Sequence, residues 1–324
     1  MKIVLTAPLL AFVINLAFAL IIVKFVALPL HGPMTHILES IWPDVLRPYL
    51  DPVNDRTYVL MGCSGLSAYV LVAMLLCTFM DCLPGASRHK VQQHRSFFTL
   101  SEWLQAVGVG LGNLFLFHWF ATIPCWTLQR RGGGPGEWEE PLSVPRALAH
   151  FVIHGLVIDV WFYSTHYLLH SKLLYARIHK FHHRFKAPTA VACVYANPIE
   201  FVFGNVGGVV LGPALTRCHP YSAAFWMAYA LTATSMTHSG WRIFGADDHD
   251  AHHEVFHFNY GVGLFMDKLM GTCLPAGYAK GAPGGAPAPW NARAREDAHP
   301  VLSGVGESVD RAAAGKRPSK EKRR

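Results

Sequence analysis

The chain has 324 residues, of which 52% are hydrophobic and only 15% are charged, so it is more apolar than an ordinary soluble domain. Its formal net charge of +7 gathers at the C-terminus, where residues 280–324 hold ten Lys or Arg and five acidic residues. Because no basic stripe with interleaved aromatic residues accompanies this tail, the charge argues against a nucleic-acid-binding protein.

Two apolar segments near the N-terminus are each long enough to cross a bilayer. Residues 3–23 are almost entirely apolar, and about 20 helical residues span a hydrocarbon core of about 30 Å. An A-x-A pattern at residues 17–19 is typical of a signal-peptide cleavage site, but the apolar character continues to residue 30, which favours an uncleaved anchor. A Pro-rich loop should follow, and residues 58–79 form the second predicted span, with small residues suited to close helix packing.

Two further spans are predicted before the middle of the chain. The polar stretch at residues 81–96 carries three basic residues and indicates a cytosolic loop. A third span is expected at about residues 104–125, followed by a glycine-rich turn region at residues 130–141. The fourth apolar segment, residues 148–165, leads directly into a pair of histidines. If all four segments cross, the N-terminus and these histidines lie on the cytosolic side.

Residues 198–236 predict a hydrophobic helical hairpin, because this mostly apolar stretch is broken once, by the polar turn at residues 216–221. Four glycines in the first arm predict a short, weak helix that only dips into the bilayer. After Gly271 the pattern decays into a Gly/Pro-rich and polar remainder that predicts a disordered tail. Lys320 and Lys322, the fifth and third positions from the end, resemble a di-lysine retrieval signal for the endoplasmic reticulum.

The chain contains seven cysteines and no C-x-x-C pair, and several of these cysteines fall inside apolar runs. An odd number without paired spacing is not the pattern of a disulfide framework. We therefore expect buried, reduced thiols in a chain that faces the cytosol and the lipid.

The nineteen histidines are unevenly spread, and eight of them fall into three spaced groups. The first group has the spacing H-x-x-x-H and the other two share H-x-x-H-H, so on helices each group would project from one face. A single pair is often an ordinary interfacial feature, but two copies of the triplet are hard to attribute to composition. Neutral imidazoles converging from adjoining helices suit iron, zinc or copper. The candidate ligands are these eight and a lone histidine before the third group: His166, His170, His179, His182, His183, His238, His249, His252 and His253.

Asp159 is an ionisable residue inside the fourth apolar segment, where it costs roughly 2.5–3.5 kcal/mol and needs a partner. Two helical turns separate it from the first histidine pair, so Asp159, Tyr163 and that pair share one stripe. We expect Asp159 to accept a hydrogen bond from a ligand histidine and so fix its tautomer, with an ion pair to another span as the alternative. His150 and His154 lie off this stripe and deeper, which predicts packing or helix–helix contacts.

The three groups HYLLH, HKFHH and HDAHH resemble, in order and form, the three histidine boxes of the membrane fatty acid hydroxylase and sterol desaturase superfamily. Agreement extends to Asp159, to YANPIEF after the second box, to NYG and MDKLMGT after the third, and more faintly to HKVQ at residues 89–92. The resemblance covers residues 146–274. It implies an all-α integral membrane helical bundle of about four spans plus a hydrophobic hairpin, with a cytosolic, histidine-rich cap for two metal ions.

The chain is accordingly expected to have three parts: an N-terminal transmembrane region (1–145), a catalytic domain of the fatty acid hydroxylase type (146–275) and a disordered basic tail (276–324). The resemblance implies two non-haem iron ions, O2, and electrons from NAD(P)H passed through cytochrome b5 and its reductase. The nine histidines would hold the metals, Asp159 and Tyr163 would position them, and no further residue would be catalytic.

The implied activity is hydroxylation or desaturation of a lipid held between the spans, and the chain looks most like the C-4 methylsterol oxidases. The protein would be a multi-pass enzyme of lipid or sterol biosynthesis in the endoplasmic reticulum membrane, with its catalytic face and C-terminus in the cytosol. Its partners would be the lipid or sterol substrate, the membrane and the electron donor, without nucleic acid.

Two departures from the family pattern leave the substrate open. Asn197 stands where the family usually has His in YAHPIE, and Tyr167 stands where an Arg commonly follows the first His. A sphingolipid or fatty-acid hydroxylase and a sterol C-5 desaturase are alternatives within the superfamily. A zinc hydrolase is less consistent, because H-E-x-x-H needs Glu where Tyr167 stands and one catalytic zinc needs only three protein ligands. A non-catalytic sterol-binding protein is the last alternative.

Overall fold

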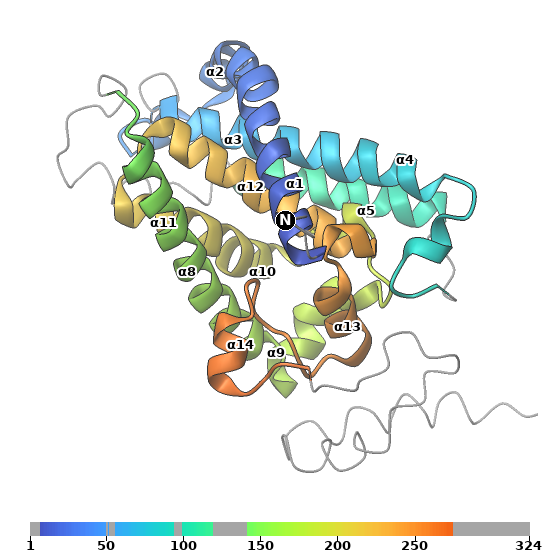
Figure 1. The fold of residues 1–324 in the computed structure, drawn as a ribbon. Coiled ribbons are helices and arrows are strands. Elements are labelled where there is room, and N and C mark those ends of the chain that lie inside the picture. Colours follow the sequence, from blue (N-terminus) through green and yellow to red (C-terminus); the bar gives the residue numbers. More distant parts are fainter. Residues whose placement is uncertain (1–6, 50, 52–55, 94–98, 119–140, 275–324) are drawn as a thin grey trace, which may run out of the picture.

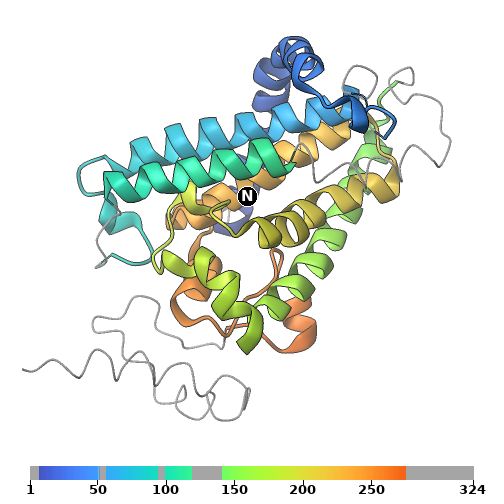
Figure 2. The same cartoon turned by 180° about the vertical axis from the view of Figure 1, so that it is seen from behind.

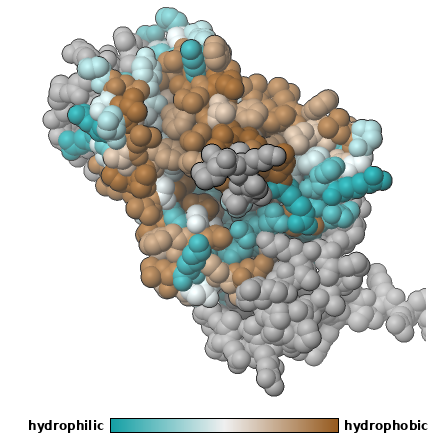
Figure 3. Space-filling model, in the orientation of Figure 1, coloured by the Kyte–Doolittle hydropathy of each residue, from teal (hydrophilic) through white to brown (hydrophobic). Residues whose placement is uncertain are grey.

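All regular elements in the described part of the chain are helical, as the sequence predicts (Figures 1 and 2). The computed structural model describes residues 7–49, 51, 56–93, 99–118 and 141–274. Four helices in these ranges are long and apolar enough to cross a membrane: Pro8–Ile41, Thr57–Asp81, Val144–Leu169 and Pro198–Thr216. A broad hydrophobic surface covers the bundle in Figure 3, and hydrophilic residues gather over the region of α13.

The first of these helices is longer than predicted. It is continuous through three consecutive parts: α1 (Ala7–Ile22), the π-helical turn η1 (Val23–Ala27) and α2 (Leu28–Ile41). The loop that was expected after residue 30 therefore begins only at Trp42. Pro33 lies inside this helix and does not end it. Leu38 and Trp42 are buried in the core, which holds the extra turns against the bundle.

The second helix agrees with the predicted span. It consists of α3 (Arg56–Ala68), the π-helical turns η3 (Tyr69–Cys77) and α4 (Thr78–Asp81). The short 3₁₀ turns η2 (Asp44–Leu46) and η4 (Ala86–His89) lie in the loops on either side of it.

The next helix, α5 (Leu100–Gly112) with η5 (Asn113–His118), begins where a capping box forms. Thr99 Oγ1 accepts the backbone N–H of Glu102, and Glu102 Oε2 accepts the backbone N–H of Thr99. The rest of the predicted third span and most of the glycine-rich turn lie outside the described residues, so this span stays a prediction.

The first arm of the predicted hairpin packs along α8 (Val144–Leu169), and it is not the short helix that its glycines suggested. One helix of 19 residues is formed by α10 (Pro198–Glu200), η8 (Phe201–Val206) and α11 (Gly207–Thr216). A Cβ at Gly207 would lie 3.0 Å from Trp161 Nε1, and one at Gly212 would lie 2.9 Å from the ring of His154. The glycines thus let α8 approach closely, and this packing offsets their low helix propensity.

The second arm, α12 (Pro220–His238), is the central helix of the bundle. It packs against α3, α1 and α8, and most of its residues are buried by protein (Figure 1). Because α12 enters after the turn that follows α11, its C-terminus returns to the end of the bundle at which α8 finishes. His238 is thereby delivered to the same end as the three histidine boxes.

Short elements form a cap at this end (Figures 1 and 2). They are α9 (Lys172–Arg177), the 3₁₀ turns η6 (His179–Arg184), η7 (Ala190–Ala192) and η9 (Arg242–Phe244), and the helices α13 (Asp247–Val255) and α14 (Phe265–Met270). The predicted tail, with its di-lysine pattern, lies outside the described residues.

Six of the seven cysteines lie in the described residues, and all six are free thiols. Four of them are buried, as expected. Cys82 is exposed and Cys273 is half-buried, because both lie in loops outside the helical bundle.

Candidate metal centre

The histidines gather at one end of the bundle on four different elements. The first box closes α8, with His166 in its last turn and His170 directly after it. The third box lies on α13, and His238 is the last residue of α12. The second box forms the 3₁₀ turn η6 rather than the expected α-helix, because Ile178 leaves helical geometry and ends α9. A 3₁₀ turn rotates successive side chains by about 120°, which separates neighbouring rings.

The nine histidines divide into two groups, and within each group the candidate ligand atoms lie within 4.8 Å of one another. Neighbours in the sequence separate: His182 and His183 belong to different groups, and so do His252 and His253. The second and third boxes therefore both contribute to both groups. The first group contains His166, His170, His179, His183 and His252, and the second contains His182, His238, His249 and His253.

Backbone carbonyl groups orient more than half of these rings. A carbonyl oxygen can only accept, so each of these rings carries its proton on Nδ1 and turns the Nε2 lone pair toward its group. The five Nδ1–H donors and their acceptors are His166 to Tyr260 (2.7 Å), His182 to Tyr195 (3.2 Å), His238 to Thr234 (2.7 Å), His252 to Phe258 (2.7 Å) and His253 to Phe185 (3.1 Å).

In the second group these lone pairs face one another. His182 Nε2 lies 3.4 Å from His238 Nε2, and neither atom carries a proton. His249 Nε2 lies 2.9 Å from His238 Nε2 and 3.1 Å from His253 Nε2, but its single proton can satisfy only one of them. Buried lone pairs that face each other repel, and a cation between them removes the repulsion. The donor set therefore fits a bound metal ion.

The first group shows the same deficit. His170 Nε2 and His183 Nδ1 are buried and have no hydrogen-bond partner. His166 Nε2 and His179 Nε2 lie 3.0 Å apart, and His252 Nε2 lies 3.2 Å from His183 Nε2. Unsatisfied buried nitrogens at this density are rare without a ligand. This group also fits a metal ion, and it has one more imidazole than the second.

Burial keeps the imidazoles neutral, which is the form that binds metals. Desolvation lowers the pKa of His179 and of His252 to about 3, and it does the same to the pKa of His238 in the second group. The pKa of His253 is also held well below its ordinary value, first by burial and then by the neighbouring His249. The rings are therefore unprotonated at neutral pH.

Glu200 is a residue of the site that the sequence analysis missed. It is buried, and its Oε1 lies 2.8 Å from His179 Nδ1, so that it can accept the Nδ1–H and turn His179 Nε2 toward the first group. Its other oxygen, Oε2, is buried without a partner. The available signal was a glutamate in the YANPIEF motif at the start of an apolar helix.

The prediction that Asp159 accepts a hydrogen bond from a ligand histidine is wrong. Its two oxygens accept the backbone N–H groups of Gly263 (2.7 Å) and Met266 (2.8 Å), because the loop after the third box folds back over α8. A second buried carboxylate, Asp267, accepts the N–H groups of Tyr260 (2.8 Å) and Gly261 (2.7 Å). The effect on the histidines is indirect: Asp159 holds the loop whose Tyr260 carbonyl orients His166.

Two residues near this loop explain its tight geometry. A Cβ at Gly261 would lie 2.8 Å from Asp159 Oδ1 and 2.9 Å from Asp267 Oδ2, so only glycine fits between the carboxylates. Tyr163 lies beside the loop, where its hydroxyl accepts a hydrogen bond from Thr272 Oγ1 (3.3 Å). The expected role of Tyr163 as a supporting residue stays a prediction.

The HKVQ segment connects the N-terminal helices to the centre. Gln92 Nε2 donates to Asp250 Oδ1 (2.6 Å) on α13 and to the carbonyl of Lys186 (2.9 Å) after the second box. Lys90 Nζ lies 2.7 Å from Asp81 Oδ1, which also accepts the indole N–H of Trp241 (2.7 Å). The segment therefore joins the second and third boxes to the end of the second membrane-spanning candidate.

The two departures from the family pattern have packing roles. Asn197 caps α10, since its Oδ1 accepts the backbone N–H of Ile199 (3.0 Å). The ring of Tyr167 stacks on Tyr163 with a centroid distance of 5.9 Å, and its edge meets Tyr260 at 5.2 Å. Neither residue belongs to the two histidine groups.

The region that carries the histidines is similar to known proteins. The family model described as Fatty acid hydroxylase matches residues 151–272, which include all nine grouped histidines. The chain is 38% identical over 128 residues to fatty acid hydroxylase domain-containing protein 2 of Homo sapiens, a match that covers 39% of this chain and 38% of that protein. The chain thus spans well under half the length of this human relative.

Two relatives match over more of their length. A putative methylsterol monooxygenase of Dictyostelium discoideum is 33% identical over 62% of this chain and 78% of its own length. Methylsterol monooxygenase erg25B of Aspergillus fumigatus is 31% identical over 60% of this chain and 70% of its own length. No solved structure matches the chain.

Proposed function

The chain belongs to the fatty acid hydroxylase family, and on that premise we propose that it is a membrane-bound non-haem di-iron oxidoreductase that hydroxylates or desaturates a lipid with O2. The observation that carries the proposal is the division of nine imidazoles into a group of five and a group of four. Two ligand groups suit two metal ions, whereas one catalytic zinc needs three protein ligands. When bound, an iron pair supplies the O2 activation that attack on an unactivated C–H bond requires.

The residues of this chain hold and shield such a centre. The first group, which includes His252 of α13, would hold one ion. The second group, which includes His238 of α12, would hold the other. Backbone carbonyls fix the ring orientations in advance, and eight of the nine rings are buried, His249 being half-buried. Among the residues that the structure describes, Glu200 is the one carboxylate that contacts a ring of the two groups, so the centre would stay cationic.

The proposed substrate is a lipid, with a C-4 methylsterol as the first candidate. Two of the relatives are named methylsterol monooxygenases, and a third, from Mycosarcoma maydis, is named a fatty acid hydroxylase. A sphingolipid or fatty acid and a sterol C-5 position remain the alternative substrates. Such a substrate would be held within the membrane, between the four candidate spans.

The remaining elements of the proposal concern the cell. Electrons would come from NAD(P)H through cytochrome b5, and the protein would reside in the endoplasmic reticulum membrane with its histidine cap in the cytosol. The catalytic domain would extend over residues 146–275, between an N-terminal transmembrane region (1–145) and a basic tail (276–324). The match of the family model to residues 151–272 supports the central boundary.

Metal analysis of the purified protein, combined with O2 uptake by the reduced protein, tests this proposal. Two irons per chain and uptake that depends on added methylsterol or fatty acid are expected. One zinc per chain without uptake would favour a hydrolase, and a metal-free protein that binds sterol would favour a non-catalytic role. Either outcome would overturn the proposal that the protein is an oxygenase.

We predict that His182→Ala and His252→Ala, one from each group, each abolish turnover while the protein still inserts into membranes. Each substitution removes one imidazole from a buried group of candidate ligands. Turnover and iron content are measured on membranes with equal protein content. His36→Ala, an exposed histidine on α2, is the control and should keep both. Full activity in either group variant would remove the histidine centre from the mechanism.

A further inference from the structure

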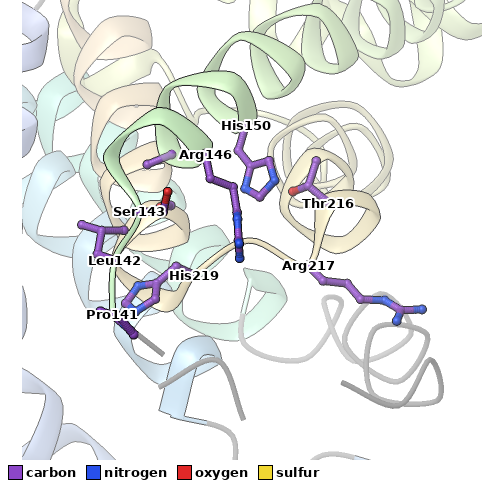
Figure 4. A pocket seen from close by; sticks show the side chains of 10 residues that line it. Pro141, Leu142, Ser143, Arg146, His150, Thr216, Arg217 and His219 are labelled. Carbon is purple, nitrogen blue, oxygen red and sulfur yellow. The ribbon is translucent and has the colours of Figure 1, made fainter. Parts of the chain in front are cut away.

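A polar cavity of about 220 Å³ lies at the start of α8, whereas the histidine centre lies at its end. Figure 4 shows side chains that line this cavity. It lies between the first turns of α8 and the turn that joins α11 to α12. About 20 helical residues of α8 separate Arg146 from His166, a distance of about 30 Å, comparable to the thickness of a bilayer core. The cavity is therefore no part of the metal centre and would face the other leaflet.

The lining is basic and rich in hydroxyl groups. Arg146 and His150 project from α8 toward Thr216 and His219 (Figure 4), and Arg217 follows at the turn. Ser143 and Ser222 add hydroxyls, and no acidic residue is among the described lining residues. The cavity also lies at the N-termini of two long helices, α8 and α12, whose dipoles favour negative charge. Its chemistry therefore suits a phosphate.

Ser222 gives a second sign of a missing partner. The residue is 9% exposed, it lines the cavity, and its Oγ is buried with no hydrogen-bond partner. By contrast, the neighbouring hydroxyl of Thr216 is engaged: its Oγ1 lies 2.8 Å from His154 Nε2. That contact joins α8 to α11 and confirms the expected helix–helix role of His154. A hydroxyl left unpaired in a polar lining is a donor for an anion.

The surface around the cavity is apolar. On α8, Val144, Leu148 and Val152 are each more than 60% exposed, and Leu215 on α11 is 64% exposed. Such residues belong against lipid chains rather than water. An occupant with an anionic head and apolar tails would satisfy both the basic cavity and this flank, whereas a free phosphate would satisfy only the cavity.

We propose that this cavity binds the phosphate headgroup of an anionic phospholipid, with the acyl chains lying along the outer faces of α8 and α11. The headgroup would bridge the start of α8 to the turn between α11 and α12. Since α8 and α12 both carry ligand histidines at their other ends, the lipid would hold together two helices on which the centre depends.

The test uses the full-length protein in neutral detergent, with phosphatidic acid, phosphatidylcholine and inorganic phosphate as separate additions. Phosphatidic acid should raise the midpoint of thermal unfolding and remain bound in native mass spectra, whereas phosphatidylcholine and inorganic phosphate should not. Equal effects of both lipids, or an equal effect of inorganic phosphate, would overturn the proposal. These arms need only the unmodified protein.

A variant locates the site. Arg146→Gln combined with Arg217→Gln should weaken retention of phosphatidic acid at least about tenfold, since hydrogen bonds to charged groups are the strong ones. Arg177→Gln, an exposed arginine on α9 at the histidine end, is the matched control and should retain it. Ser222→Ala should weaken retention to a smaller extent and serves as well if the double variant does not insert. Unchanged retention in both cavity variants would show that the lipid binds elsewhere.

Discussion

Glu200 shows how one buried carboxylate can be kept at a site built from neutral ligands. It stands at the start of an apolar helix, yet its environment provides a single partner, the Nδ1–H of His179. A buried carboxylate with an unsatisfied oxygen is costly, and removal of a charge from such a site is normally favourable. A cation bound to the other side of the His179 ring would reverse that balance. The residue is therefore best explained by a positively charged centre.

We predict that Glu200→Gln weakens metal binding by the first group by roughly 10- to 100-fold, the usual effect of mutating the residue that hydrogen-bonds a ligand histidine from behind. Glutamine keeps the size and can still accept the Nδ1–H, but without the negative charge. Iron per chain is measured after dialysis against a graded chelator. Glu39→Gln, an exposed glutamate on α2, is the control. Equal iron retention in the variant and the unmodified protein would contradict this role.

At the scale of elements, the segment 89–92 acts as a strap between parts of the chain that are far apart in sequence. The backbone N–H of Val91 donates to the carbonyl of Gly240 (2.9 Å), and the side chain of Gln92 reaches both Asp250 and Lys186. Asp250 lies on α13 between two ligand histidines. The strap therefore fixes α13, which supplies two of the four rings in the second group and one of the five in the first.

Gln92→Ala should release α13, because it leaves the carboxylate of Asp250 and the carbonyl of Lys186 without their shared donor. Loss of such a donor costs about 1–3 kcal/mol. The second group should lose its metal first, so iron per chain should fall from two toward one. Gln93→Ala removes the adjacent, exposed amide, which bonds only locally to Arg88, and should leave the iron content unchanged. Identical iron content in the Gln92→Ala and Gln93→Ala variants would contradict this prediction.

At the scale of the whole molecule, the centre joins separate elements that also meet through side-chain packing and hydrogen bonds. The ligand histidines come from α8, η6, α12 and α13, and their buried rings repel without a cation. Metal binding would therefore add directly to the stability of the folded bundle, because the unfolded chain cannot present the same groups.

The metal-free protein should lose stability as the pH falls. The pKa of His179, of His238 and of His252 is lowered from 6.5 to about 3 by burial, so below pH 6.5 the unfolded chain takes up protons that the folded chain refuses. The stability that these three rings contribute is thus complete above 6.5 and declines as the pH falls toward 3. Unfolding midpoints of the metal-free protein in detergent should drop between about pH 7.5 and about pH 5.5. A flat profile would mean that the rings are not buried as described.

Much of the architecture could be predicted from the sequence, because it depends on local composition and spacing. The apolar segments that became the helices Thr57–Asp81 and Val144–Leu169 were evident from their length. Eight of the nine histidines that the structure brings together were evident from their spacing, and His238 was a candidate as the lone histidine before the third group. The helix Pro8–Ile41 and the arm Pro198–Thr216 were underestimated, because proline and glycine lower local helix propensity while packing against the core and α8 restores it.

The sequence by itself determined which segments are apolar enough for a membrane and which residue types could bind metal, since both follow from the side chains and their order. Only the tertiary structure decided that His182 and His183 serve different groups, that Asp159 holds a loop rather than a histidine, and that Glu200 stands behind His179. These features depend on contacts between residues far apart in the chain. Spacing along one helix carries no information about such contacts, because they form only when separate elements pack.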